Sequence, residues 1–194
     1  MQLDDYTKSV LSDEKLLRSK LLIYFKKPEA VEYYAKTAIL AFNAGEQKEL
    51  KKVRDWSWWG FFYGWIFLWY RKSSEGSEAC IVFTLSLFFG FLYALSTANA
   101  QEQLVLFVFS ICASLLIANH LGKYSKFYII EEFIYNLKRS NGDDALLATY
   151  GETNTFALIF GVIVSPVLIP GGIFLLSFPF LVILSVIIQR LATS

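Results

Sequence analysis

Hydrophobic side chains in residues 1–55 recur at the three- and four-residue spacing of amphipathic helices. The clearest stripe lies between Pro28 and Gly45, residue types that favour the first position of a helix and the position after its last turn. A second stripe precedes it, with Ser12 as a candidate cap. The apolar positions of the two stripes are Leu17, Leu21, Tyr24, Val31, Tyr34, Ala35, Ala38, Ile39 and Phe42. We expect two or three helices, which need a cover from the membrane part, lipid headgroups or another protein, because so short a region rarely folds firmly alone.

Residues 56–70 form an aromatic segment that holds all five tryptophans of the chain. As a helix, the segment reaches about 22 Å at ~1.5 Å per residue, which is less than the ~30 Å hydrocarbon core of a bilayer. Tryptophan and tyrosine also favour the headgroup boundary over the bilayer centre. We therefore predict an interfacial or shallowly re-entrant helix. The predicted membrane-interface residues are Trp56, Trp58, Trp59, Trp65, Trp69, Tyr70, Arg71 and Lys72.

Two glycines share one face of this predicted helix, opposite a stripe of large aromatic side chains. Gly60 and Gly64 are four residues apart, a spacing that lets the backbone of a second helix approach closely. We predict them as helix-packing positions. An aromatic anchor without a specific partner is an equally supported alternative.

Two apolar runs follow and predict a transmembrane hairpin. Residues 79–98 carry no charged side chain and are long enough to cross a bilayer, and a second span is expected at 103–121. The short link between them has no lysine or arginine, whereas both flanks have several, among them Lys52, Arg54, Arg71 and Lys123. For the basic run at 45–54, a topology signal is favoured over a contact with anionic lipid. The positive-inside rule then places the link outside and both flanks, with the N-terminus, in the cytoplasm.

The rest of the chain is predicted to contain a surface helix and a broken apolar run. Residues 121–139 mix aromatic and basic side chains in a pattern suited to lying along a membrane, and a turn follows at 141–144. Residues 156–188 are uncharged and too long for one untilted span. A helical hairpin, which the central Pro-Gly-Gly favours, and a single kinked span both stay open. The predicted hinge residues are Pro166, Pro170, Gly171 and Gly172.

Composition and residue inventory exclude several classes of function. A content of 55 % hydrophobic residues is typical of a chain that contacts lipid. A net charge of +1 gives no positive electrostatic field of the kind that nucleic-acid binding needs. One histidine and two separated cysteines cannot assemble a common zinc site, and no glycine-rich phosphate loop occurs. We therefore predict no enzymatic activity, no cofactor and no metal site. For His120, at the inner end of a predicted span, a polar boundary marker is favoured over a phosphate-binding group.

The aromatic segment resembles the signature of an uncharacterised family of small bacterial inner-membrane proteins. Residues 56–72 are similar to that family's Trp-x-Trp, Phe-Phe-x-Gly and Trp-x-x-Tyr-Arg-Lys segment, which a hydrophobic hairpin follows. The resemblance covers about residues 50–130 and departs at Trp59, where a small residue is usual, and in the C-terminal apolar run. It implies a bacterial inner-membrane location and a multi-pass architecture, and it supplies no activity.

Together these patterns predict an all-α, polytopic helical membrane protein. Its four parts are 1–55 (cytoplasmic amphipathic helices), 56–122 (aromatic helix and hairpin), 123–154 (cytoplasmic surface helix and turn) and 155–194 (hairpin or kinked span). The leading hypothesis is a non-enzymatic interaction, scaffold or assembly factor that contacts membrane lipid and recruits a protein partner through residues 1–55. The alternative is a small-solute or lipid transporter or pore subunit built on the broken C-terminal run. A membrane-bound enzyme acting on lipid ranks third.

Overall fold

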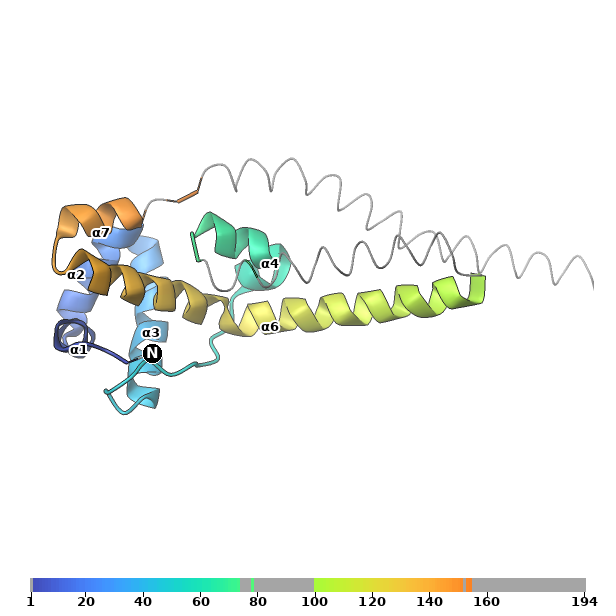
Figure 1. Ribbon diagram of the computed structural model, residues 1–194, viewed down its shortest axis with the longest axis horizontal. Helices are drawn as coiled ribbons and strands as arrows, with labels where there is room; N and C mark the ends of the chain where they lie inside the picture. Colours follow the sequence, from blue (N-terminus) through green and yellow to red (C-terminus); the bar gives the residue numbers. More distant parts are fainter. Residues whose placement is uncertain (1, 74–77, 79–99, 152, 155–194) are drawn as a thin grey trace, which may run out of the picture.

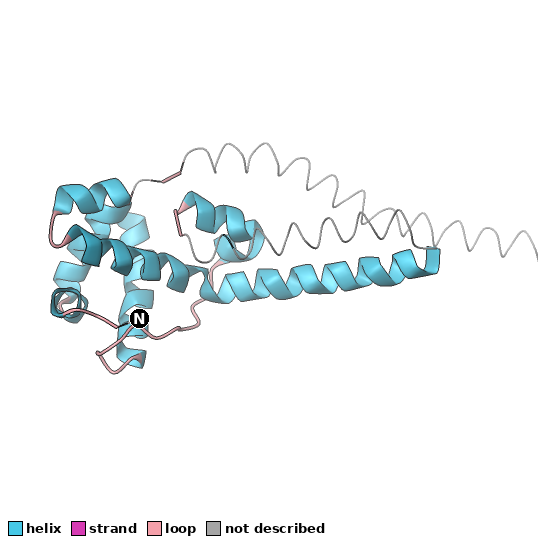
Figure 2. Cartoon of the chain, in the orientation of Figure 1, coloured by secondary structure: helices cyan, strands magenta, loops and turns pink. Residues whose placement is uncertain are grey.

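The computed structural model describes residues 2–73, 78, 100–151 and 153–154, and this part of the chain is all-α, as predicted (Figure 2). No helix within it combines the length and the apolar character that a membrane span requires, and this includes the helix that contains the expected second span at 103–121. The expected span 79–98 and the expected hinge at 166–172 lie outside the described residues. The helices are α1 (Asp5–Ser12), α2 (Glu14–Phe25), α3 (Pro28–Ala44), α4 (Trp58–Tyr70), α6 (Ala100–Ser140) and α7 (Asp144–Tyr150).

Short polar side chains and proline set the starts of these helices. The carboxylate of Asp13 accepts hydrogen bonds from two backbone amides in the first turn of α2, so this residue, and not the expected Ser12, is the cap. Asp143 begins α7 in the same way, directly after the predicted turn. Helix α3 starts at Pro28 and ends before Gly45, as the sequence predicts.

Helix α6 continues without a break through Gly122, where the sequence predicted that a span ends and a surface helix begins. Its 41 residues reach about 60 Å at ~1.5 Å per residue. Figure 1 shows its C-terminal half among α1, α2, α3 and α7, while its N-terminal half extends away from them. No proline interrupts the helix, and one glycine is too weak a signal to end it.

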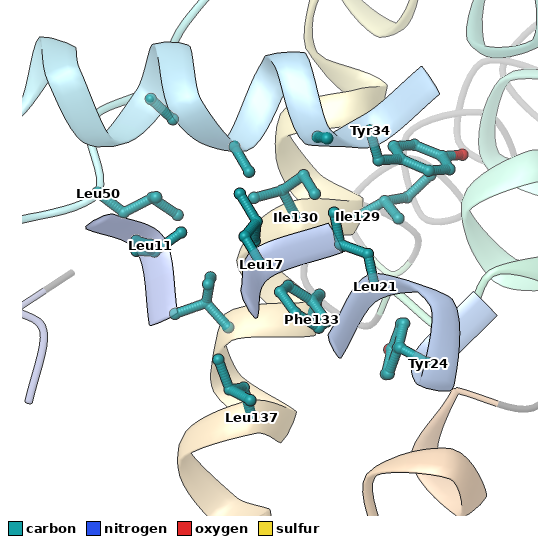
Figure 3. Packing of buried hydrophobic residues seen from close by; sticks show 14 of the residues in the cluster. Leu11, Leu17, Leu21, Tyr24, Tyr34, Leu50, Ile129, Ile130, Phe133 and Leu137 are labelled. Atoms are coloured by element: carbon teal, nitrogen blue, oxygen red, sulfur yellow. The ribbon is translucent and has the colours of Figure 1, made fainter. Parts of the chain in front are cut away.

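The C-terminal half of α6 supplies the cover that the first three helices need. Leu17 and Leu21 of α2 pack with Ile130 and Phe133 of α6, and all four side chains are fully buried (Figure 3). Burying each such side chain contributes about 1.5–3 kcal/mol. The apolar face of residues 121–139 therefore fills a protein core, which corrects the expectation that it lies along a membrane.

Helix α7 closes the other side of this core. Leu147 is buried against α2, and the ammonium group of Lys20 on α2 forms an ion pair with Asp144. The chain passes so close to α2 at Gly151 that an added Cβ would lie 1.9 Å from the carbonyl oxygen of Tyr24. Helices α1, α2, α3 and α7, with residues 121–140 of α6, form the unit that we call the helical domain.

Replacing Phe133 with alanine is expected to lower the free energy of unfolding by about 3–5 kcal/mol, because it leaves a cavity between α2 and α6. The matched control is Tyr135→Ala on the same helix, where the side chain is 54 % exposed and its loss changes little. Chemical denaturation followed by circular dichroism measures both variants. Equal losses for the two variants would contradict this core.

Candidate functional site

Helices α4 and α6 cross closely at a point where each of them has a glycine. An added Cβ on Gly60 would lie 2.1 Å from the hydroxyl oxygen of Ser125 and 2.7 Å from the carbonyl oxygen of Leu121. From the other side, an added Cβ on Gly122 would lie 2.9 Å from the ring of Trp56. Larger residues would force the two helices apart, so Gly60 lies at a close helix–helix contact of the kind that its spacing suggested.

Gly64 has a different part in the same contact. Its φ of 50° and ψ of −123° lie outside the helical region, so α4 is kinked there. A side chain would be strained in this conformation, and glycine adopts it readily. An added Cβ would still face Leu121 at 3.3 Å. Both glycines therefore face α6, and the second also bends α4.

The first turns of α4 present large aromatic side chains on the surface. Trp58 is 62 % exposed and stacks on Phe62, which is 70 % exposed. Trp59 stacks on Tyr63 beside them, and both are also exposed. We call these four side chains the aromatic face. The other predicted interface residues of the aromatic segment are Trp56, which is 37 % exposed and packs on α6, Trp65 within α4, and Trp69 and Tyr70, which are partly buried at the end of α4.

Arg71 joins the end of α4 to the helical domain, although the sequence suggested a contact with lipid headgroups. Its guanidinium carbon lies 5.3 Å from the ring centre of Phe25, 5.8 Å from that of Tyr34 and 5.5 Å from that of Tyr70. Such cation–π contacts strengthen when they are shielded from water. Burial raises the pKa of Tyr34 well above the usual range of a phenol, so this ring stays neutral. Lys72, the next residue, is exposed.

A buried ion pair fixes the segment that leads into α4. The ammonium group of Lys126 donates to a carboxylate oxygen of Asp55 at 3.0 Å, and the side chains are 9 % and 16 % exposed. Thr37 of α3 donates to the same oxygen. The backbone amides of Asp55 and Ser57 donate to carbonyl oxygens of Lys123 and Gly122, at 3.0 and 2.7 Å. These bonds attach the segment to α3 and α6 together.

The hydroxyl oxygen of Ser57 begins α4 by accepting a hydrogen bond from the amide of Gly60. The same oxygen also accepts a hydrogen bond from the hydroxyl group of Tyr33, at 2.9 Å. The ring of Tyr33 lies 4.0 Å from the ammonium group of Lys126. The cap of α4 and the buried ion pair therefore belong to one polar network.

Basic and tyrosine side chains meet on the surface of α6 beside this network. The ammonium group of Lys52 donates to the hydroxyl group of Tyr128 at 2.6 Å, and Arg54 donates to that of Tyr124 at 3.1 Å. A ring nitrogen of His120 lies 3.1 Å from the same Tyr128 hydroxyl group. Lys52, Arg54 and His120 are exposed. We call these five residues, with the neighbouring Lys123, the basic–tyrosine cluster.

The N-terminal half of α6 exposes apolar side chains just beyond this cluster. Leu116 is 70 % exposed and lies one helical turn before His120. Val105, Val108 and Leu115 are also exposed. The surface of α6 therefore changes from apolar to basic within a single turn, beside the aromatic face of α4.

From the sequence, we interpreted Lys52 and Arg54 as part of a topology signal and His120 as a marker of the membrane boundary. The sequence analysis therefore did not predict that these residues form one cluster. The four-residue spacing of Leu116, His120, Tyr124 and Tyr128 along one helix is a signal that could have revealed its α6 side. Among the residues that the structure describes, no group of three His, Cys, Asp or Glu side chains is arranged to hold a metal ion.

Comparisons with protein families, with curated proteins and with solved structures found no match to this chain. The resemblance of residues 56–72 to a family of inner-membrane proteins therefore stays a prediction.

Removing one partner of the Asp55–Lys126 pair is expected to cost about 3–5 kcal/mol, because the other charge is left buried without compensation. The double variant Asp55→Asn with Lys126→Met is expected to lose less than the sum of the two single variants. Denaturation midpoints of the three variants measure this coupling. As a control, Lys48→Met removes an ion pair with Glu46 whose side chains are over 80 % exposed, and should change nothing measurable. Additive effects at Asp55 and Lys126 would contradict the pairing.

Proposed function

We propose that this chain is a non-enzymatic, polytopic membrane protein that holds its helical domain on the cytoplasmic face of a bacterial inner membrane as an interaction or assembly factor. The observation that carries the proposal is the continuity of α6. The same helix contributes Phe133 to the core of the helical domain and presents Leu116 on an exposed apolar surface. A rigid helix with these two ends can fix a polar domain beside a lipid phase.

The aromatic face supports this placement. Exposing Trp58, Trp59, Phe62 and Tyr63 together to water is unfavourable, whereas tryptophan and tyrosine are stabilised at the boundary between lipid headgroups and acyl chains. The close crossing of α4 with residues 121–125 of α6 holds α4 on this helix with its glycines inward, so the aromatic face points outward. The uncharged runs at 79–98 and 156–188 are consistent with further contact with lipid.

The partner contact predicted for residues 1–55 needs side chains that are exposed there. Leu17, Leu21, Tyr34 and their neighbours in the stripes of residues 1–55 are covered by α6 and α7 and cannot meet a partner. Leu22 of α2 and Leu40 of α3 are exposed on the same helices. We place the protein-binding surface of the helical domain there.

Tryptophan fluorescence tests the position of α4, because all five tryptophans lie in residues 56–70. In vesicles, lipids brominated close to the headgroup should quench the emission more than lipids brominated at the chain end. The double variant Trp58→Phe, Trp59→Phe should lose most of this quenching, and the control Trp56→Phe should keep it, since Trp56 packs on α6. Emission that only aqueous iodide quenches would contradict the placement.

Site-specific photocrosslinking in native membranes tests the interaction. Photoreactive amino acids at Leu22 and Leu40 should give the same protein adduct, identified by mass spectrometry, because both positions face outward. Exposed positions on other helices, Tyr135 of α6 and Leu146 of α7, serve as controls and should give less. The absence of a reproducible adduct at both leucines would overturn the interaction role.

A further inference from the structure

The fold gathers cationic side chains from two distant segments into the basic–tyrosine cluster. Lys52 and Arg54 precede α4, whereas Lys123 belongs to α6. Within the described part of the chain, no carboxylate forms an ion pair with Lys52, Arg54 or Lys123. The nearby Asp55 points inward to Lys126. The repulsion among these cations is therefore not compensated by the described carboxylates.

The electrostatic effect of the cluster is visible at Tyr124. The hydrogen bond from Arg54, together with the charges of Lys52 and Lys123, lowers the pKa of the Tyr124 hydroxyl group. A field that stabilises a phenolate at this position also stabilises other oxyanions. An anion that binds here would reduce the repulsion among the cations and gain charge-assisted hydrogen bonds.

The donors in the cluster suit a phosphate group. The guanidinium group of Arg54 has further N–H donors beside the one bonded to Tyr124, and the ammonium group of Lys52 has two beside the one bonded to Tyr128. The Tyr124 oxygen accepts its bond from Arg54, so the hydrogen of this hydroxyl group is available to a ligand. Arginine and lysine with such donors are common partners of phosphate oxygens.

The surface next to the cluster selects among ligands that carry a phosphate. Leu116 lies one turn from His120 and is exposed, and the exposed Cys112 lies one turn further along α6. The further apolar side chains Val105, Val108 and Leu115 are exposed on the same half of α6. A ligand that matches both surfaces has an anionic head and an apolar tail.

We propose that the basic–tyrosine cluster binds the phosphate of an anionic membrane phospholipid, with an acyl chain of that lipid lying along Leu116. Lys52, Arg54 and Lys123 supply the charge, and the hydroxyl group of Tyr124 orients the phosphate oxygens. The inference rests on the proposed membrane attachment and adds a headgroup preference to it.

Native mass spectrometry of the full chain in mild detergent tests this site by titration with phosphatidylglycerol, phosphatidylcholine and inorganic phosphate. We expect phosphatidylglycerol to bind more tightly than phosphatidylcholine. The triple variant Lys52→Gln, Arg54→Gln, Lys123→Gln should weaken phosphatidylglycerol binding by roughly a hundredfold, at about fivefold per cation. The control triple variant Lys15→Gln, Lys36→Gln, Lys48→Gln removes the same charge elsewhere and should bind as the unmodified chain does.

Leu116→Gln separates a phospholipid from free phosphate as the source of the anion. This variant should bind phosphatidylglycerol less tightly and leave binding of inorganic phosphate unchanged. Binding of phosphate without any effect of Leu116 would overturn the lipid assignment, and equal losses in the two triple variants would overturn the site. Because this titration uses detergent-solubilised protein, its failure is distinguishable from a failure of membrane attachment, which the quenching of tryptophan by brominated lipids reports separately.

Discussion

The structure depends on the burial of one face of α6 between the N-terminal helices and α7. Phe133, Ile130 and Leu137 are inaccessible to water, and α2 alone could not cover them. The apolar stripes of α2 and α3 likewise depend on α6, because without it each stripe would face solvent. Residues 1–50 and 121–150 therefore stabilise one another, although about seventy residues separate them in the chain.

Local features of the sequence predicted much of the secondary structure. Proline at 28 and glycine at 45 gave the bounds of α3, and the turn at 141–144 was placed correctly, because these residue types have strong backbone preferences. The spacing of Gly60 and Gly64 indicated the side of α4 that meets another helix. These successes share one cause, which is that the signal lies within a few neighbouring residues.

The errors arose where the outcome depends on contacts between distant segments. A run of Phe, Ile and basic residues at 127–139 suits either a membrane surface or a protein core, and only the docking of α2 decides between them. The sequence likewise could not show that Arg71 packs on Phe25 or that Lys52 reaches Tyr128. The continuity of α6 was missed for a related reason. The prediction divided the chain after residue 122 because charged side chains resume there, whereas the helix continues and Gly122 admits the close approach of Trp56.

The unbroken length of α6 has a mechanical consequence. A helix of about 60 Å without a hinge acts as a lever, so a change in inclination at one end moves the other end with it. A tilt of about 10°, well within the range that membrane helices adopt, displaces the far end by about 10 Å. The helical domain is packed on that end and would move with it as one body. Under the proposed membrane attachment, bilayer thickness or lipid composition sets in this way how far the exposed leucines of α2 and α3 stand from the membrane.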